Sequence, residues 1–157
     1  MVLRRVPFAN PMRWDCNKGG PGANCFNRLK RPKIEEFADC FSRGSAFGDV
    51  DGVVDNGGRA FLFLEWKNTD KECLDAGQRR LFVGLTSTDP RFTVVVVCGN
   101  AETMEVRAIR VIHGGKIGSL ELTDLAGLKR RLCRWWRRGL PASEIPSYDR
   151  DHPEAAP

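Results

Sequence analysis

The sequence predicts an α/β fold in which a central mixed β-sheet is flanked by helices. Two segments indicate buried strands: residues 92–98 are almost purely aliphatic, and residues 61–64 are apolar on both faces of an extended chain. Three other segments, 33–42, 74–85 and 122–138, repeat apolar residues at helical spacing. Together they predict alternating helices and strands in the order α-β-β-α-β-β-α.

The first half of this order is a helix followed by a β-hairpin. In the predicted helix 33–42 the apolar residues fall at i, i+3, i+4 and i+7: Ile34, Phe37, Ala38 and Phe41. Residues 47–54 and 59–67 are predicted strands, and the Asn-Gly-Gly sequence of residues 56–58 is typical of the turn that joins a hairpin.

The second half adds a helix, two strands and a basic helix. Helix 74–85 leads to the aliphatic strand 92–98. Residues 105–113 alternate less regularly and are a weaker strand prediction, and the glycines at 114–115 turn the chain. Helix 122–138 has an apolar side made of Leu125, Leu128, Leu132, Trp135 and Trp136.

The 157 residues suit one domain with a core of ordinary size, and no linker divides them. Within residues 1–157 we expect a basic irregular N-terminal segment over 1–32 and the core over 33–138. The acidic, proline-containing tail 139–157 is predicted to be loose.

Charge is distributed unevenly along the chain. Residues 1–33 hold eight basic residues and one acid, and residues 129–138 hold six basic residues and no acid. Residues 34–56 hold six acids and one arginine. Basic ends around an acidic centre favour a protein that binds a polyanion at its flanks and a cation in the middle. The alternative is that these charges only solvate the surface.

The ends of the chain and its apolar runs bear on localisation. Met1–Arg5 leads into proline and asparagine rather than an apolar stretch, so we expect no signal peptide. The longest aliphatic run, 94–97, is too short to span a bilayer. We therefore expect no membrane association and a cytoplasmic protein, in the host cytoplasm if a phage encodes it.

Six cysteines are scattered through the chain without Cys-x-x-Cys spacing. The pattern favours reduced, mostly apolar cysteines in a reducing cytosol. A zinc site that uses Cys16 and Cys25, on either side of a glycine-rich loop, is the alternative.

Two charges end the second predicted strand. Side chains alternate along a strand, so Glu65 and Lys67 share a face, and Asp51 precedes them across the hairpin. A carboxylate and an ammonium beside a buried strand are costly to desolvate unless they pair or bind a ligand. Carboxylates with a backbone carbonyl, of Leu64 or Trp66, are the hard oxygen ligands that Mg²⁺ prefers. The pattern indicates a metal site suited to phosphodiester cleavage.

These residues resemble the PD-(D/E)XK nuclease superfamily. The matching motifs are Asp51 in GDVDGVV and Glu65-Trp66-Lys67 in the next strand. The resemblance implies a restriction-endonuclease-like core, Mg²⁺ held by Asp51 and Glu65 (with Mn²⁺ substituting), and Lys67 orienting or activating the attacking water.

A second motif resembles the Gln-x-x-x-Tyr sequence of RecB-like members, with Phe82 in place of tyrosine. Helical spacing puts Gln78 and Phe82 on one face. An amide at the head of an apolar stripe needs a partner, and the carboxylates of the site or a substrate phosphate would serve. The alternative is that Gln78 only caps the helix end.

Further metal ligands are expected from the acids near the first strand. Family members often carry a glutamate on the first helix, and Glu36 is our choice over Glu35 because Asp39 continues its side of the helix. Either glutamate is otherwise a surface acid at a helix start. Asp49 lies two residues before Asp51, on the same face of a strand, and is a rival or second ligand.

Basic residues in three regions are predicted to hold nucleic acid. Lysine and arginine neutralise phosphates, and a tryptophan among arginines can stack on an unpaired base. Large aromatic residues on an apolar helix face usually pack, so we expect at least one of Trp135 and Trp136 in the core. The predicted DNA-binding residues are Arg28, Lys30, Arg31, Arg79, Arg130, Arg134, Trp135 and Arg137.

The leading hypothesis from sequence is a Mg²⁺-dependent DNA nuclease, structure- or end-specific, in phage-type DNA recombination or processing. Exonuclease and junction resolvase both stay open. Many members of the superfamily act as dimers or higher rings, so the resemblance leaves a homo-oligomer open. The alternatives are a catalytically silent nucleic-acid-binding or inhibitory protein on the same fold, and a zinc-stabilised interaction module.

Overall fold

The computed structural model describes Phe37, Cys40, Phe41 and residues 50–69 and 74–139. The chain divides into two units, residues 1–48 and 49–157, so every strand and helix below belongs to the second unit. The prediction of one domain stays a prediction.

Several predicted segments lie outside the described residues. They include the basic segment 1–32 and all of the acidic tail except Gly139. Of the predicted helix 33–42 only Phe37, Cys40 and Phe41 are described, with Phe37 and Cys40 in a 3₁₀ conformation.

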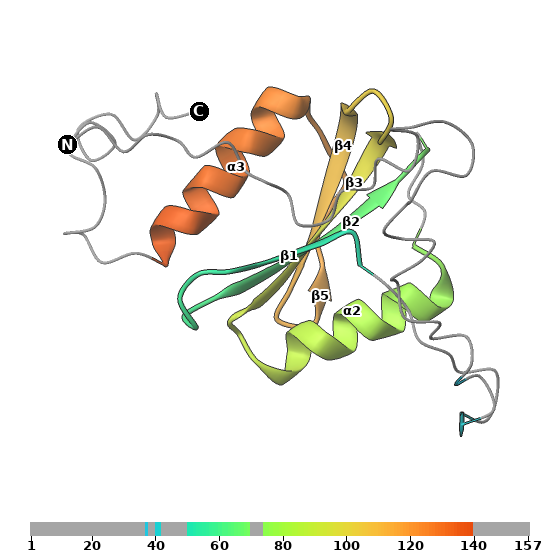
Figure 1. Ribbon diagram of the computed structural model, residues 1–157, viewed down its shortest axis with the longest axis vertical. Coiled ribbons are helices and arrows are strands. Elements are labelled where there is room, and N and C mark those ends of the chain that lie inside the picture. The colour runs from blue at the N-terminus through green and yellow to red at the C-terminus, as the bar shows by residue number, and fades with distance from the viewer. Residues whose placement is uncertain (1–36, 38–39, 42–49, 70–73, 140–157) are drawn as a thin grey trace, which may run out of the picture. The chain divides into compact units, whose positions relative to one another are not determined.

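The second unit contains one mixed sheet. Its strands are β1 (Gly52–Asp55), β2 (Phe61–Lys67), β3 (Phe92–Asn100), β4 (Glu105–His113) and β5 (Lys116–Ile117), in that spatial order, and β6 (Glu121–Leu122) pairs with β4. Among the strands of the described residues, only the β2–β3 pair is parallel. A parallel pair needs a crossover, which helix α2 (Ala76–Thr88) supplies, and helix α3 (Leu125–Arg138) follows β6 (Figure 1).

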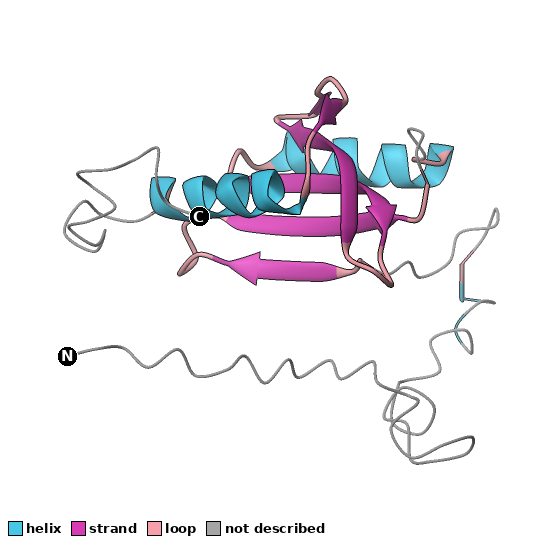
Figure 2. Ribbon diagram, turned by 90° about the horizontal axis from the view of Figure 1, so that it is seen from above, coloured by secondary structure: helices cyan, strands magenta, loops and turns pink. Residues whose placement is uncertain are grey.

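The two helices cover opposite faces of the sheet (Figures 1 and 2). One core cluster joins Leu62 and Val95 of the sheet to Leu128 of α3, with Leu64 and Trp66 against it. The other joins Val94 and Ile112 to Phe82 of α2, with Phe63 against it. The expectation that residues 61–66 are covered on both faces is therefore confirmed, and the coarse α/β class with it.

Some predicted boundaries are wrong at the hairpin. Of the predicted strand 47–54, residues 47–49 lie outside the described residues, and β1 begins after Asp51. Asp51 donates its N–H to the Leu64 carbonyl outside the regular ladder. The predicted strand 59–67 begins at Phe61, because Arg59 belongs to the turn and donates its N–H to the Asn56 carbonyl. Both turn glycines, Gly57 and Gly58, have positive φ, as hairpin turns of this kind require.

The helix boundaries also differ from the prediction, for reasons of capping. Asp75 accepts a hydrogen bond from the backbone of the first turn, so α2 starts at Ala76 rather than at residue 74. It continues to Thr88 instead of 85, and Ser87 and Thr88 donate their hydroxyls back to helix carbonyls. Asp124 caps α3 in the same way, so α3 starts at Leu125, and Leu122, the first residue of the predicted helix, is in β6 instead.

The C-terminal strands are longer or more numerous than predicted. Strand β3 runs to Asn100 rather than to residue 98, with a register shift at Cys98/Gly99. The weaker strand prediction for residues 105–113 is confirmed, because β4 begins and ends at the predicted residues. The glycine turn at 114–115 leads into β5, a two-residue strand without a readable pattern in the sequence.

A buried asparagine ties the hairpin to α3. Asn56 is 1% exposed and donates its side-chain amide to the Trp136 carbonyl at 2.7 Å, in the last turn of the helix. The same carbonyl also accepts the backbone N–H of Gly139, the C-cap residue of the helix, at 3.1 Å. The turn of β1–β2 and the end of α3 are thus held together although 80 residues separate them. Among the described residues no helix is long and apolar enough to cross a membrane.

Candidate active site

The end of β2 carries the ion pair that the sequence places there. Glu65 and Lys67 share the sheet face that α2 covers, the face of Phe63. Lys67 Nζ lies 2.7 Å from Glu65 Oε1, and the two side chains are 19% and 8% exposed. The carboxylate is therefore held almost out of water with a cation on one oxygen.

Gln78 of α2 reaches the same carboxylate oxygen. Its Nε2 donates to Glu65 Oε1 at 2.7 Å. The residue is positioned by the helix cap, because Asp75 Oδ1 accepts the Gln78 backbone N–H at 2.8 Å. Phe82, four residues on, is fully buried in the core beneath. The contact expected between Gln78 and a carboxylate of the site is present, so Gln78 does more than cap the helix.

Two oxygens around this contact have no hydrogen-bond partner within the described part of the chain. Gln78 Oε1 is buried and accepts no hydrogen bond there. Glu65 receives both of its donors on Oε1, so its Oε2 has none from these residues. Buried polar atoms are normally satisfied, so the buried Gln78 Oε1 marks a place where a donor or a cation can bind.

Asp51 lies at the same end of β2. Its Oδ2 accepts the Trp66 backbone N–H at 2.5 Å, which holds the carboxylate beside the residue that follows Glu65. The side chain is otherwise exposed. Of the two backbone carbonyls considered as ligands, that of Leu64 already accepts the Asp51 N–H at 3.1 Å. We call Asp51, Glu65, Lys67 and Gln78 the strand-end cluster.

The donor set of the strand-end cluster fits a hard divalent cation. It offers two carboxylates and backbone carbonyls, the oxygen ligands of Mg²⁺. Within the described ranges no group of three or more acidic, histidine or cysteine side chains comes together. Glu36 and Asp49, the further ligands expected from sequence, lie outside those ranges, as do Cys16 and Cys25 of the zinc alternative.

The predicted DNA-binding residues fall on two sides of the sheet. Arg79 is exposed on α2, next to Gln78. Arg130 and Arg134 are exposed and Arg137 is half-buried on α3, which covers the opposite face. Arg28, Lys30 and Arg31 lie outside the described residues. The residues of α3 therefore do not surround the strand-end cluster.

The tryptophan chosen for DNA binding is in part a core residue. Trp135 packs against the cluster of Leu62, Val95 and Leu128. Trp136 is 39% exposed instead. The expectation that at least one of the two packs is confirmed, but it applies to Trp135, because the helix turns that side chain toward the sheet.

Arg110 is a residue of this face that sequence reasoning did not single out. Cross-strand partners share a face, and Glu65, Val96 and Arg110 form one row across β2, β3 and β4. An arginine among Val106, Ala108 and Ile112 on one face of the predicted strand was the available signal. The row places Arg110 on the same sheet face as Lys67 and Glu65.

No protein-family model matches this chain, and no curated protein and no solved structure matches it.

Proposed function

We propose that this protein is a Mg²⁺-dependent DNA nuclease of the PD-(D/E)XK type. The observation that supports this best is the convergence of Lys67 and Gln78 on one oxygen of Glu65, each at 2.7 Å. Asp51 hydrogen-bonds the backbone one residue along β2. Two carboxylates, a lysine and an amide at one strand end match the residue types of both motifs. We also propose that the sheet and its helices form a restriction-endonuclease-like core.

Each residue has a separate task in hydrolysis. Asp51 and Glu65 would hold Mg²⁺ or Mn²⁺ with a backbone carbonyl, and the ion would supply positive charge against the charge that develops on the phosphate. Lys67 donates a hydrogen bond from its ammonium to the attacking water or to a phosphate oxygen and so orients it. Gln78 is a positioning residue that fixes the rotamer of Glu65 through Nε2.

The substrate we propose is DNA, on the basis of charge. Helix α3 has six basic residues and no acid, and Arg79 stands exposed beside Gln78. Lysine and arginine on phosphates give affinity without reading sequence. This favours structure- or end-specific cutting in phage-type DNA recombination or processing, by an exonuclease or a junction resolvase, in the cytoplasm. A homo-oligomer would supply a longer DNA-binding surface.

The test is a cleavage panel of linear duplex, circular, single-stranded and four-way-junction DNA with Mg²⁺ or Mn²⁺. We expect cutting of at least one substrate, its loss in EDTA, and its loss in Asp51→Ala, Glu65→Ala and Lys67→Ala. Circular dichroism shows whether each variant is folded. If folded wild-type protein cut none of the substrates with either metal, the nuclease proposal would be wrong.

The ion pair between Lys67 and Glu65 favours a second candidate function. Lys67 neutralises the charge of Glu65 without a ligand, as it would in a catalytically silent nucleic-acid-binding or inhibitory protein. Calorimetry separates the two functions. Two results together would support the silent protein. The wild-type protein would bind neither Mg²⁺ nor Mn²⁺, and its DNA affinity would be unchanged after alanine replaces Asp51, Glu65 and Lys67.

A further inference from the structure

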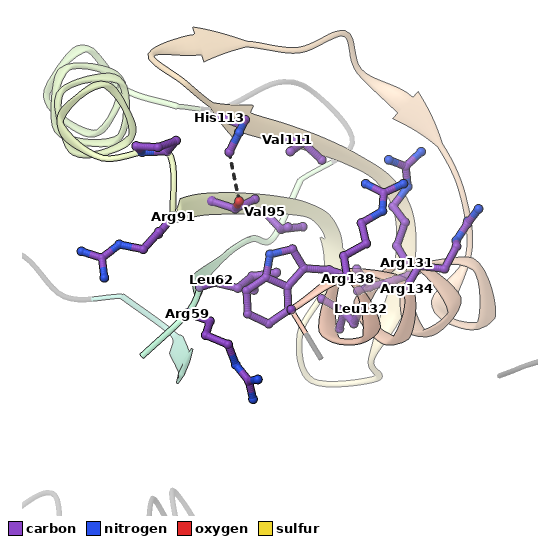
Figure 3. A pocket seen from close by; sticks show the side chains of 16 residues that line it. Arg59, Leu62, Arg91, Val95, Val111, His113, Arg131, Leu132, Arg134 and Arg138 are labelled. Carbon is purple, nitrogen blue, oxygen red and sulfur yellow. Dashed lines mark hydrogen bonds between the residues drawn. The ribbon is translucent and has the colours of Figure 1, made fainter. Parts of the chain in front are cut away.

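A pocket of about 660 Å³ lies on the other face of the sheet from the strand-end cluster (Figure 3). It is bounded by α3 and by the ends of three strands, where β2 and β3 begin and β4 ends. Its volume is within the range of about 300–1,000 Å³ that is typical of small-molecule sites. We call it the arginine pocket.

The floor of the arginine pocket is apolar. It combines sheet residues with residues of α3 that belong to the same core cluster. Leu62, Val95 and Leu128 are buried there, and Trp135 is half-buried against them. The floor residues are Leu62, Val95, Val111, Leu128, Leu132 and Trp135. A flat aromatic body can pack on such a floor, and the indole of Trp135 gives it a stacking partner.

The rim of the arginine pocket is basic. Figure 3 shows Arg59 and Arg91 on one side of the floor and Arg131, Arg134 and Arg138 on the other. None of the residues that line the pocket within the described part of the chain is an acid. Such a rim favours an anion, and the guanidinium fork matches phosphate oxygens in particular.

Two of these arginines are already neutralised. Asp89 binds Arg91 at 2.7 Å, and this hydrogen bond holds the pKa of Asp89 below its ordinary value. Glu121 pairs with Arg131. Arg134 and Arg138 have no carboxylate partner within residues 50–69 and 74–139. They stand four residues apart on α3, where like charges repel, so an anion between them would relieve that repulsion.

His113 adds a hydrogen-bonding group at the far end. Its Nδ1 lies 3.1 Å from the Phe92 carbonyl and 3.2 Å from the Thr93 hydroxyl, and Thr93 also lines the pocket. These two contacts leave Nε2 of the ring for a ligand. A base or a sugar hydroxyl carries hydrogen-bonding groups of the kind that an imidazole nitrogen binds.

We infer that the arginine pocket binds a nucleoside phosphate, with the base on the floor beside Trp135 and the phosphate between Arg134 and Arg138. Inorganic phosphate would leave the apolar floor unused, and an uncharged aromatic compound would leave the two arginines unpaired. The nucleotide is either free or part of a DNA strand, because both present the same base and phosphate. The inference does not rest on the nuclease proposal, since the pocket shares no residue with the strand-end cluster.

The test is calorimetric binding to the full chain in EDTA, which removes metal-dependent cleavage. The probes are dATP, oligodeoxyadenylate, deoxyadenosine and inorganic phosphate. The variant is Arg134→Gln with Arg138→Gln. The control, Arg80→Gln with Lys129→Gln, removes the same charge from exposed residues that do not line the pocket.

We expect the pocket variant to weaken binding by at least about 10-fold, since it loses charge-assisted bonds to phosphate, and the control by less than about 3-fold. That pattern with dATP assigns a free nucleotide, and the same pattern with oligodeoxyadenylate alone assigns a nucleotide within a strand. Equal weakening by both double variants would overturn the inference, as would phosphate binding as tightly as dATP. No binding of any probe at millimolar concentration would also overturn it. Unchanged binding in Glu65→Gln separates this site from the proposed nuclease.

Discussion

Replacing Lys67 with methionine tests whether the ion pair at the end of β2 exists in solution. The substitution keeps an unbranched apolar stem and removes the ammonium that lies 2.7 Å from Glu65 Oε1. Gln78 Nε2 then becomes the one remaining donor to this carboxylate among the described residues. Glu65, whose side chain is 8% exposed, must keep its charge with half of its present hydrogen bonds.

The expected loss of stability follows from that burial. Losing a hydrogen bond to a charged group costs about 1.5–3 kcal/mol, and breaking a fully buried pair costs about 3–5 kcal/mol. Lys67 is 19% exposed and Gln78 stays in place, so the smaller range applies. We expect Lys67→Met to lower the free energy of unfolding by about 2 kcal/mol.

Urea unfolding at pH 7, followed by tryptophan fluorescence, measures this loss. Glu65→Gln and the double variant complete a cycle, in which we expect a coupling of about 1–2 kcal/mol between Glu65 and Lys67. Lys129→Met is the control, since exposed Lys129 is on the other side of the sheet and should change stability by about 0.5 kcal/mol or less. A Lys67→Met loss no larger than that of the control, together with zero coupling, would refute the reasoning.

Three further predictions concern other contacts. Gln78→Leu should lower the cleavage rate of the proposed nuclease by about 10-fold or more at unchanged metal affinity, because Glu65 loses its positioning donor; an unchanged rate would make Gln78 structural only. Asn56→Ala should lower the free energy of unfolding by about 1–3 kcal/mol in urea, because a buried amide and a helix-end carbonyl lose their bond; a loss under about 0.5 kcal/mol would contradict this. Gly99→Ala should lower the melting temperature, because its Cβ would lie 1.9 Å from the Glu105 carbonyl oxygen and overpacking costs about 1–3 kcal/mol; Gly84→Ala, with open space around its Cβ, is the control and should not.

The fold was predictable where it depends on the spacing of apolar residues within one segment. Alternation along β2 separates Leu62, Leu64 and Trp66 from Phe63 and Glu65, and the structure packs the two sets against different helices. An aliphatic run long enough for a strand predicts β3 at the sheet centre for the same reason, since such a strand is stable only when both faces are covered.

Element ends were less predictable, because they depend on caps and turns. Asp75 and Asp124 each end the extended chain by accepting a helix N–H, which moves the start of α2 and of α3 later than the apolar stripe indicates. Strands β5 and β6 have two residues each and exist only because β4 offers them an edge. No short-range pattern encodes such a pairing.

The candidate site shows the same division. Glu65 and Lys67 are two residues apart on one strand, so their shared face follows from sequence alone. The contact of Gln78 with Glu65 joins residues 13 apart and depends on how α2 crosses the sheet. The position of Asp51 depends on a bond to the Trp66 backbone outside the ladder.

By itself, the sequence of this protein determined its α/β class, the central strands and the charged pair at the end of β2, because each depends on side-chain period and apolar content over a few residues. Only the tertiary structure decided which face each helix covers. That choice packs Trp135 into the core, separates the arginines of α3 from the strand-end cluster, and creates the arginine pocket with its apolar floor. Such features arise from contacts between segments far apart in the chain, whose strength depends on the packing of the whole unit.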